Sequence, residues 1–113
     1  MKIYLAVPYS HPDASIREAR FKAVNQASAY LMQYGHIVFS PISHSHPIAV
    51  QCGLPLDFDF WAKFDRSFIE WCDCFYVLKL EGWETSDGVR REMAIANELG
   101  KSPWFLRCEF NNP

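Results

Sequence analysis

Four short apolar runs, separated by stretches with helical periodicity, constrain the fold of this chain more than any other feature of the sequence. The runs are Ile3–Val7, His36–Ser40, Cys74–Leu78 and Pro103–Leu106. Continuous apolar runs are typical of strands that are covered on both faces in a parallel sheet. Strands alternating with helices imply right-handed crossovers, for which the commonest small strand order is 2-1-3-4. We therefore expect an α/β protein with a three-layer α/β/α flavodoxin-like (Rossmann-like) fold, with four to five parallel strands in one domain over residues 1–113.

Three helices are expected between these strands. Ser15-Ile16-Arg17-Glu18 matches a capping box, and the helix that it opens should end at Gly35. A second helix should cover Asp57 to Cys72, and a third should open at Ser86-Asp87 and end near Leu99. The stretch from Ile42 to Pro55 has no clean period, so we expect a long loop with at most one helical turn there. Long loops in compact domains are usually functional.

Charge and cysteine content exclude several classes of function. The formal net charge of −2 provides no electrostatic footprint for nucleic acid or an anionic membrane. The cysteines Cys52, Cys72, Cys74 and Cys108 show no CxxC spacing, which favours reduced thiols and no metal site. The N-terminal apolar run is too short for a signal peptide, and no run approaches the length of a membrane span. We expect a cytoplasmic protein.

Two carboxylates are predicted to face inward. At about 100° per residue, Glu92 falls inside the apolar stripe of its helix, and Asp65 falls in the middle of the stripe of the preceding helix. A buried carboxylate is costly unless it is paired or belongs to a polar site, so both are candidate catalytic groups. Each carboxylate also has a purely structural explanation. Glu92 lies in the first turns of its helix, where negative charge is favoured, and Asp65 could cap a neighbouring backbone or pair with Arg90.

The loops after the first and third strands should meet at the switch point of the sheet. With the order 2-1-3-4, the crevice there should be lined by Tyr9, Ser10, Trp83, Ser86 and Asp87, with Glu92 at its wall. Ser86 and Asp87 are good helix caps, and Gly88 would let a ligand approach the backbone. A helix N-terminus at this place favours anions.

The Asp57–Cys72 helix is also apolar on a second face, which holds Phe60, Phe64 and Trp71. Aromatic content of 16% is heavy for a small chain. We therefore expect a homodimer or a higher homo-oligomer formed through this helix.

These motifs, in this order, resemble the nucleoside 2-deoxyribosyltransferase superfamily, which includes the 2′-deoxynucleoside 5′-phosphate N-hydrolases. The resemblance covers most of the chain, with Ile3-Tyr4-Leu5-Ala6 and its loop, Asp65-x7-Asp73, and Ser86-x-Gly88-x3-Glu92. It implies the flavodoxin-like fold, a nucleoside or nucleotide substrate, no cofactor, and relatives among phage and bacterial proteins.

The resemblance also implies roles for individual residues. Glu92 matches the nucleophile that attacks the anomeric carbon. Asp65 matches an acid that contacts the sugar or transfers a proton, and Tyr4 matches a group that assists the reaction. Ser86 matches the serine that holds a 5′-phosphate in the hydrolases. A carboxylate can trap the oxocarbenium-like sugar, and a second acid can protonate the leaving base. Trp83 or Tyr9 could stack on the base.

The chain also departs from this pattern. The loop Tyr9-Ser10-His11 replaces a glycine and an arginine of the hydrolases, although all three residues remain candidates for substrate contact. Arg90 and Arg91 could supply a phosphate contact, or they could pair with the carboxylate and silence it, which leaves a non-catalytic nucleotide-binding module as the alternative function. His44 and His46 are candidates for base contact or proton transfer, beside the alternatives of a surface loop and a metal half-site.

Overall fold

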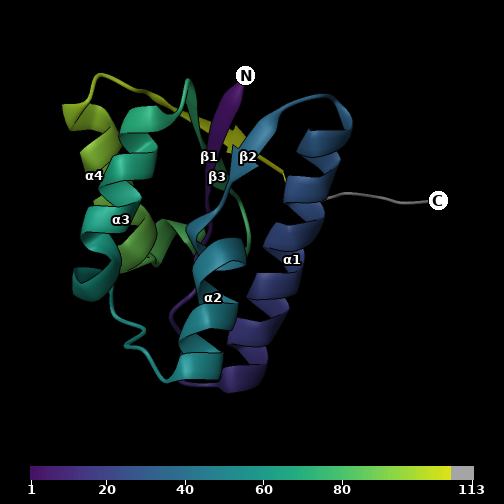
Figure 1. The fold of residues 1–113 in the computed structure, drawn as a ribbon, viewed down its shortest axis with the longest axis vertical. Helices are drawn as coiled ribbons and strands as arrows, with labels where there is room; N and C mark the ends of the chain where they lie inside the picture. Colours follow the sequence, from purple (N-terminus) through teal and green to yellow (C-terminus); the bar gives the residue numbers. More distant parts are fainter. Residues whose placement is uncertain (108–113) are drawn as a thin grey trace.

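The computed structural model describes residues 1–107, which form a parallel sheet between layers of helices (Figure 1). The elements are β1 (Lys2–Ala6), α1 (Ala14–Gln33), β2 (Ile37–Phe39), α2 (Pro41–Cys52), α3 (Phe58–Trp71), β3 (Cys74–Leu78), the 3₁₀ turn η1 (Trp83–Thr85), α4 (Asp87–Glu98) and β4 (Pro103–Leu106). The strand order is β2-β1-β3-β4 with every pair parallel, which confirms the predicted fold. Cys108 and the predicted polar tail after it lie outside the described residues.

Alternate side chains of β1 point into two different cores. Tyr4 and Ala6 face α3 and α4, where they pack with Ile69, Phe75 and Val89. On the other face, a second core fills the space below α1, and its members are Ile3, Leu5, Val7, Val24, Ala27, Leu31 and Leu78. Both faces of the strand are therefore covered, which is why β1 is continuously apolar in the sequence. Figure 1 shows α3 and α4 together on one side of the strands and α1 on the other.

Residues 41–52 form a helix, so the predicted loop between Ile42 and Pro55 is wrong for most of its length. Pro41 opens α2 at a position where proline is well tolerated, and Gly53 ends it in the left-handed region with φ of 68°. Pro47 inside the helix removes one backbone hydrogen bond. Tertiary packing overrides this cost, because His46 and Ala49 are buried.

The start of α1 also differs from the prediction. Asp13, rather than Ser15, is the N-cap, and its carboxylate accepts a hydrogen bond from the Ser15 amide at 2.8 Å. The helix therefore begins two residues before the predicted capping box, because aspartate is an equally good cap. None of the described helices is long and apolar enough to cross a bilayer.

The junction between α3 and β3 is held by a single lysine. Lys101 Nζ donates to the carbonyl oxygens of Ile69 at 2.6 Å, Glu70 at 2.8 Å and Cys72 at 2.6 Å. These carbonyls belong to the last turn of α3, which has no intrahelical donors for them. Just before β3, the Asp73 carboxylate accepts from the Lys2 amide at 2.9 Å. Together these bonds fix α3 against the sheet.

Candidate functional site

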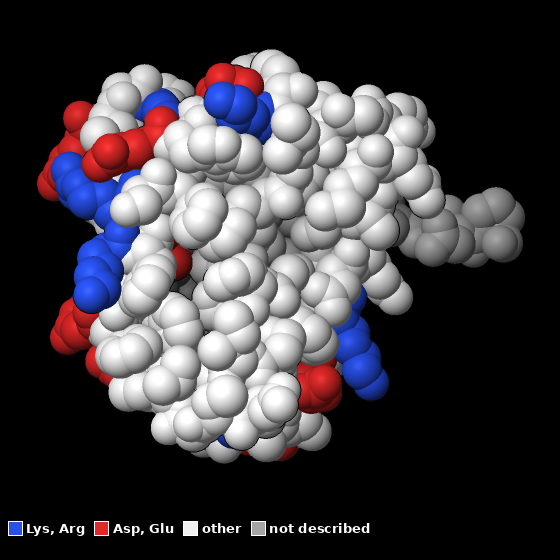
Figure 2. Space-filling view, viewed as in Figure 1, with Lys and Arg blue, Asp and Glu red and all other residues white. Residues whose placement is uncertain are grey.

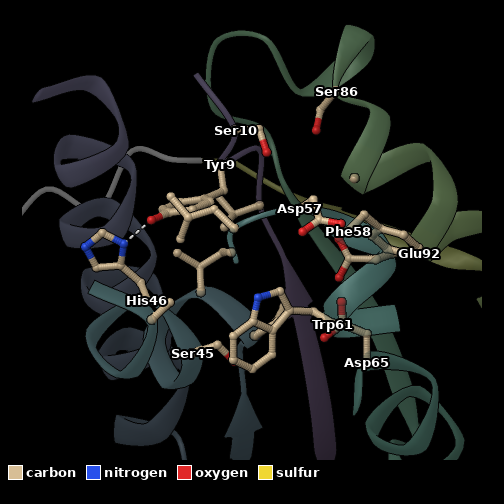
Figure 3. A pocket seen from close by; sticks show the side chains of 16 residues that line it. Tyr9, Ser10, Ser45, His46, Asp57, Phe58, Trp61, Asp65, Ser86 and Glu92 are labelled. Atoms are coloured by element: carbon tan, nitrogen blue, oxygen red, sulfur yellow. Dashed lines mark hydrogen bonds between the residues drawn. The ribbon is translucent and has the colours of Figure 1, made fainter. Parts of the chain in front are cut away.

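A pocket opens at the carboxyl ends of β1 and β3, where the predicted switch point lies (Figure 3). It is lined by Val7, Tyr9, Ser10, Pro41, Ile42, Ser45, His46, Ala49, Leu56, Asp57, Phe58, Trp61, Asp65, Ser86, Gly88 and Glu92. With its open mouth included, its volume is about 600 Å³. The enclosed part of this cavity has a volume of about 70 Å³.

Glu92 lies in the second turn of α4 and lines the pocket, although its side chain is only 4% exposed. The phenolic O–H of Tyr4 donates to Oε2 of Glu92. Tyr4 is fully buried in the sheet and does not line the pocket, so it contacts the carboxylate from behind. Burial and repulsion from Asp65 raise the pKa of Glu92 well above its ordinary value, while the Tyr4 hydrogen bond lowers it.

Asp65 projects into the same pocket from α3 and is 5% exposed. Among the described residues, no hydrogen bond or ion pair to its carboxyl is found. Burial raises its pKa to about 7. Two buried carboxyls that repel each other tend to hold one proton between them, and the bond from Tyr4 favours the charge on Glu92. The predicted inward orientation of both carboxylates is confirmed.

The arginines next to Glu92 bind other carboxylates. Arg90 donates to Asp87 at 2.9 Å, and Arg91 donates to Asp59 at 2.9 Å. Both pairs are at the surface, since each of the four side chains is more than half exposed. In the described part of the chain, neither arginine therefore neutralises Glu92, nor does Arg90 pair with Asp65.

The N-terminus of α4 forms one edge of the pocket. Ser86 caps the helix by accepting a hydrogen bond from the Val89 amide at 3.2 Å, as predicted, which leaves its O–H free to donate to a ligand. Gly88 also lines the pocket, and an added Cβ would meet nothing closer than Ser86 Oγ at 3.9 Å. Backbone is therefore open to a ligand there, as the sequence led us to expect.

Two residues predicted for the crevice lie elsewhere. The Asp87 side chain is 83% exposed and pairs with Arg90 outside the pocket. Trp83 does not line the pocket either, because its ring packs against Phe105 with a centroid separation of 5.2 Å. The short η1 turn, which periodicity did not predict, rotates Trp83 toward the core.

Tyr9 and His46 form a connected pair on the wall opposite Glu92 (Figure 3). The Tyr9 hydroxyl contacts His46 Nδ1, and His46 Nε2 lies 3.0 Å from a carboxylate oxygen of Glu18. This arrangement fits a histidine protonated on Nε2 that donates to Glu18 and accepts from the phenol. His46 is only 7% exposed. The pair therefore fixes the Tyr9 ring at the edge of the cavity, and burial raises the pKa of Tyr9.

The other two histidines that were proposed for the site lie outside the pocket. His44 contacts Ser45 Oγ at 3.3 Å and packs against the ring of Phe39. His11 accepts from the Asp13 amide at 3.0 Å, which places it in the turn before α1. The helical conformation of residues 41–52 explains the first case, since neighbouring histidines on a helix point in different directions. Within residues 1–107, no group of three or more His, Cys, Asp or Glu side chains is arranged to hold a metal.

Sequence reasoning missed one side of the pocket, which α2 and the start of α3 provide. Trp61 lines the cavity with its indole N–H bonded to the Pro55 carbonyl at 2.8 Å. Asp57 and Phe58, at the start of α3, face the cavity as well. The signal that could have found them was the helical spacing of Asp57, Trp61 and Asp65, at i, i+4 and i+8, which places the three on one face.

The sequence and the structure were compared with known proteins. A family model described as a domain of unknown function (DUF1937) matches residues 1–106. The fold is similar to that of a 2-deoxyribosyltransferase from Bacillus psychrosaccharolyticus, with 25% identity and a TM-score of 0.67, over 100% of this chain and 77% of that one. It is also similar to the CMP N-glycosidase BcmB of Clostridium botulinum, with 20% identity and a TM-score of 0.59, over 95% of this chain and 71% of that one. No curated protein shows a significant sequence match.

Proposed function

The chain belongs to the DUF1937 family, and we propose that its pocket cleaves or exchanges the N-glycosidic bond of a (deoxy)nucleoside or its 5′-monophosphate. The observation that carries this proposal is the pair of buried carboxyls, Glu92 and Asp65, that face one cavity. The similarity to a 2-deoxyribosyltransferase supports the same chemistry. We also propose that the chain belongs to a phage or bacterial branch of the nucleoside 2-deoxyribosyltransferase superfamily.

Glu92 is the proposed nucleophile. One of its oxygens accepts from Tyr4, so the other is free to bond to the anomeric carbon. As this bond forms, the carbon–nitrogen bond breaks, and its electron pair leaves with the base, which takes a proton from Asp65. Water then attacks the anomeric carbon, returns a proton to Asp65, and releases Glu92 from the ester. A second base in place of water would give transfer instead of hydrolysis.

The reaction requires a charged Glu92 and a proton on Asp65, although burial raises the pKa values of both carboxyls. Asp65 has a pKa of about 7, so a large fraction of the molecules hold a proton there at neutral pH. Tyr4 stabilises negative charge on Glu92 by its hydrogen bond, although it does not touch the cavity. We therefore propose that Tyr4 positions Glu92. Asp65 is the group that transfers the proton. Tyr9 and Trp61 supply aromatic surface for a base.

Chromatography of free base tests this proposal. The protein is incubated with the common nucleosides, deoxynucleosides and their 5′-monophosphates, and base release is compared among wild type, Glu92→Gln and Glu98→Gln. Glu98 is the matched control because it lies on the same helix, is 62% exposed, and pairs with Arg66. We expect release by wild type and Glu98→Gln only. A mass increase on the Glu92 peptide after acid quenching would report the covalent intermediate, and absence of base release from every substrate would refute the function.

We also propose that the chain assembles as a homo-oligomer through α3. Phe60 and Phe64 on this helix are 38% and 43% exposed, which is high for aromatic side chains. Figure 2 shows that the centre of this face, over α2, is nearly free of charge, and that charged residues lie on the side that holds α3 and α4. Light scattering after size-exclusion chromatography tests the assembly. Wild type should exceed the mass of 13.1 kDa expected for one chain, and Phe64→Glu should reduce it toward that value.

A further inference from the structure

Carboxylates line the pocket without a lysine or arginine among the described residues of its wall. Its ionisable lining groups are the carboxyls of Asp57, Asp65 and Glu92, together with Tyr9 and His46. Asp65 is 95% buried and, within residues 1–107, makes no hydrogen bond, so it is free to contact a ligand. A pocket of this kind suits a ligand that donates hydrogen bonds and repels one that brings negative charge.

The arginines of the surrounding elements are bound elsewhere. Arg17 donates to the His11 carbonyl, Arg20 to the carbonyls of Ser10 at 3.2 Å and Glu81 at 3.3 Å, Arg90 to Asp87 and Arg91 to Asp59. None of these arginines lines the cavity in the described structure, although the Arg17 guanidinium lies close to the Tyr9 hydroxyl at one wall and opposes the rise in its pKa that burial causes. A phosphate placed beside Asp57, Asp65 and Glu92, on the opposite wall, would therefore meet carboxylates without a lining cation to compensate for them.

The N-terminus of α4, at one edge of the pocket, favours an anion, but neighbouring groups already offset this effect. Ser86 accepts from Val89, which occupies one of the free amides of the first turn. The carboxylate of Asp87 lies in that same turn and meets the positive end of the helix dipole. Asp57 is exposed and lines the same pocket, so it stands at the mouth. Figure 3 shows it on the side of the cavity that holds Glu92.

We infer that the pocket takes a nucleoside with a free 5′-hydroxyl and discriminates against the 5′-phosphate, and that Asp57 is a residue that sets this preference. The inference rests on the proposed function and narrows its substrate class. Asp57 is the N-cap residue of α3, but its side chain makes no capping hydrogen bond, and no side-chain hydrogen bond or ion pair of Asp57 is found within the described residues. Its carboxylate is therefore available to accept from a sugar hydroxyl, and it repels a phosphate placed anywhere in this small cavity.

Calorimetric binding tests this inference. The four common 2′-deoxynucleosides and their 5′-monophosphates are titrated into Glu92→Gln, in which chemistry is blocked, and base release from the same compounds is measured with wild type. For each nucleoside that binds, we expect its monophosphate to have a Kd that is higher by about tenfold or more at 0.1 M salt. Asp57→Asn should reduce this ratio of Kd values by about threefold or more. Asp59→Asn, which changes the net charge equally from an exposed site on the same helix, should leave the ratio unchanged.

The outcomes separate this inference from the proposed function. Base release from monophosphates at equal or higher efficiency would overturn the inference and leave the function standing. An unchanged ratio in Asp57→Asn would overturn the role of Asp57. If no compound is bound or cleaved, both the function and the inference are refuted.

Discussion

Replacing Asp65 with asparagine should make the stability of this protein less dependent on pH. Asp65 is buried and unpaired within the described residues, and burial raises its pKa from 3.8 to about 7. The folded state therefore binds a proton at Asp65 more tightly than the unfolded chain does. This contribution to stability is fully present below pH 3.8 and is lost as the pH rises through 7.

The size of the effect follows from the two pKa values. A carboxyl that titrates at 3.8 unfolded and at about 7 folded makes folding about 4 kcal/mol less favourable at pH 8 than at low pH. Most of this loss, about 3 kcal/mol, falls between pH 4.5 and pH 8. Asparagine cannot ionise, so Asp65→Asn should gain about that much relative to wild type over this range.

Urea unfolding at pH 4.5, 6 and 8 measures this difference. Asp59→Asn is the control, because its carboxylate is 85% exposed on the same helix and its loss should leave the pH profile parallel to that of wild type. Glu92→Gln removes the other buried carboxyl and so isolates the effect of Asp65. The pH dependence of the unfolding free energy that is due to Asp65 should persist in this variant, because burial raises the pKa of Asp65. A constant difference between Asp65→Asn and wild type at all three pH values would refute the reasoning.

Further measurements test other contacts of the site and its frame. Tyr4→Phe removes the O–H that holds Glu92, so base release should fall about 10- to 100-fold, with smaller changes in KM than in kcat. Base release by wild type should decline as the pH rises above about 7, because Asp65 then loses the proton that the leaving base requires. Lys101→Met should lower the free energy of unfolding by about 2–4 kcal/mol, since three carbonyls at the end of α3 lose a charged donor. Arg90→Ala should change stability by less than about 0.5 kcal/mol and leave base release intact, because its pair with Asp87 is exposed; a large loss of activity there would show that Arg90 acts in the pocket.

Much of the fold could be predicted from the sequence because its signals are local. The four apolar runs and the cap at Ser86 depend on residues that are close together in the chain. The inward orientation of Asp65 and Glu92 follows in the same way, since helical periodicity assigns each side chain to a face of its own helix. Strand order followed from topology rules that limit how parallel strands connect.

The rest of the pocket depended on contacts between distant segments. Proline at position 47 predicts a break, and only the packing of α2 against α1 and β1 stabilises a helix there. That helix brings His46 to Tyr9 and Glu18, and it turns His44 away. Loop composition likewise predicted Trp83 in the crevice, whereas the half-buried ring packs against Phe105 outside the pocket.

The sequence by itself determined which carboxylates face inward and at which edge of the sheet they lie. Only the tertiary structure decided what surrounds them: Tyr4 behind Glu92, arginines bound to Asp87 and Asp59, and Asp57 at the mouth. The physical reason is that periodicity fixes the direction of a side chain within its own element. Charge pairing depends instead on distances between elements, which are set only when α3 and α4 pack on the sheet.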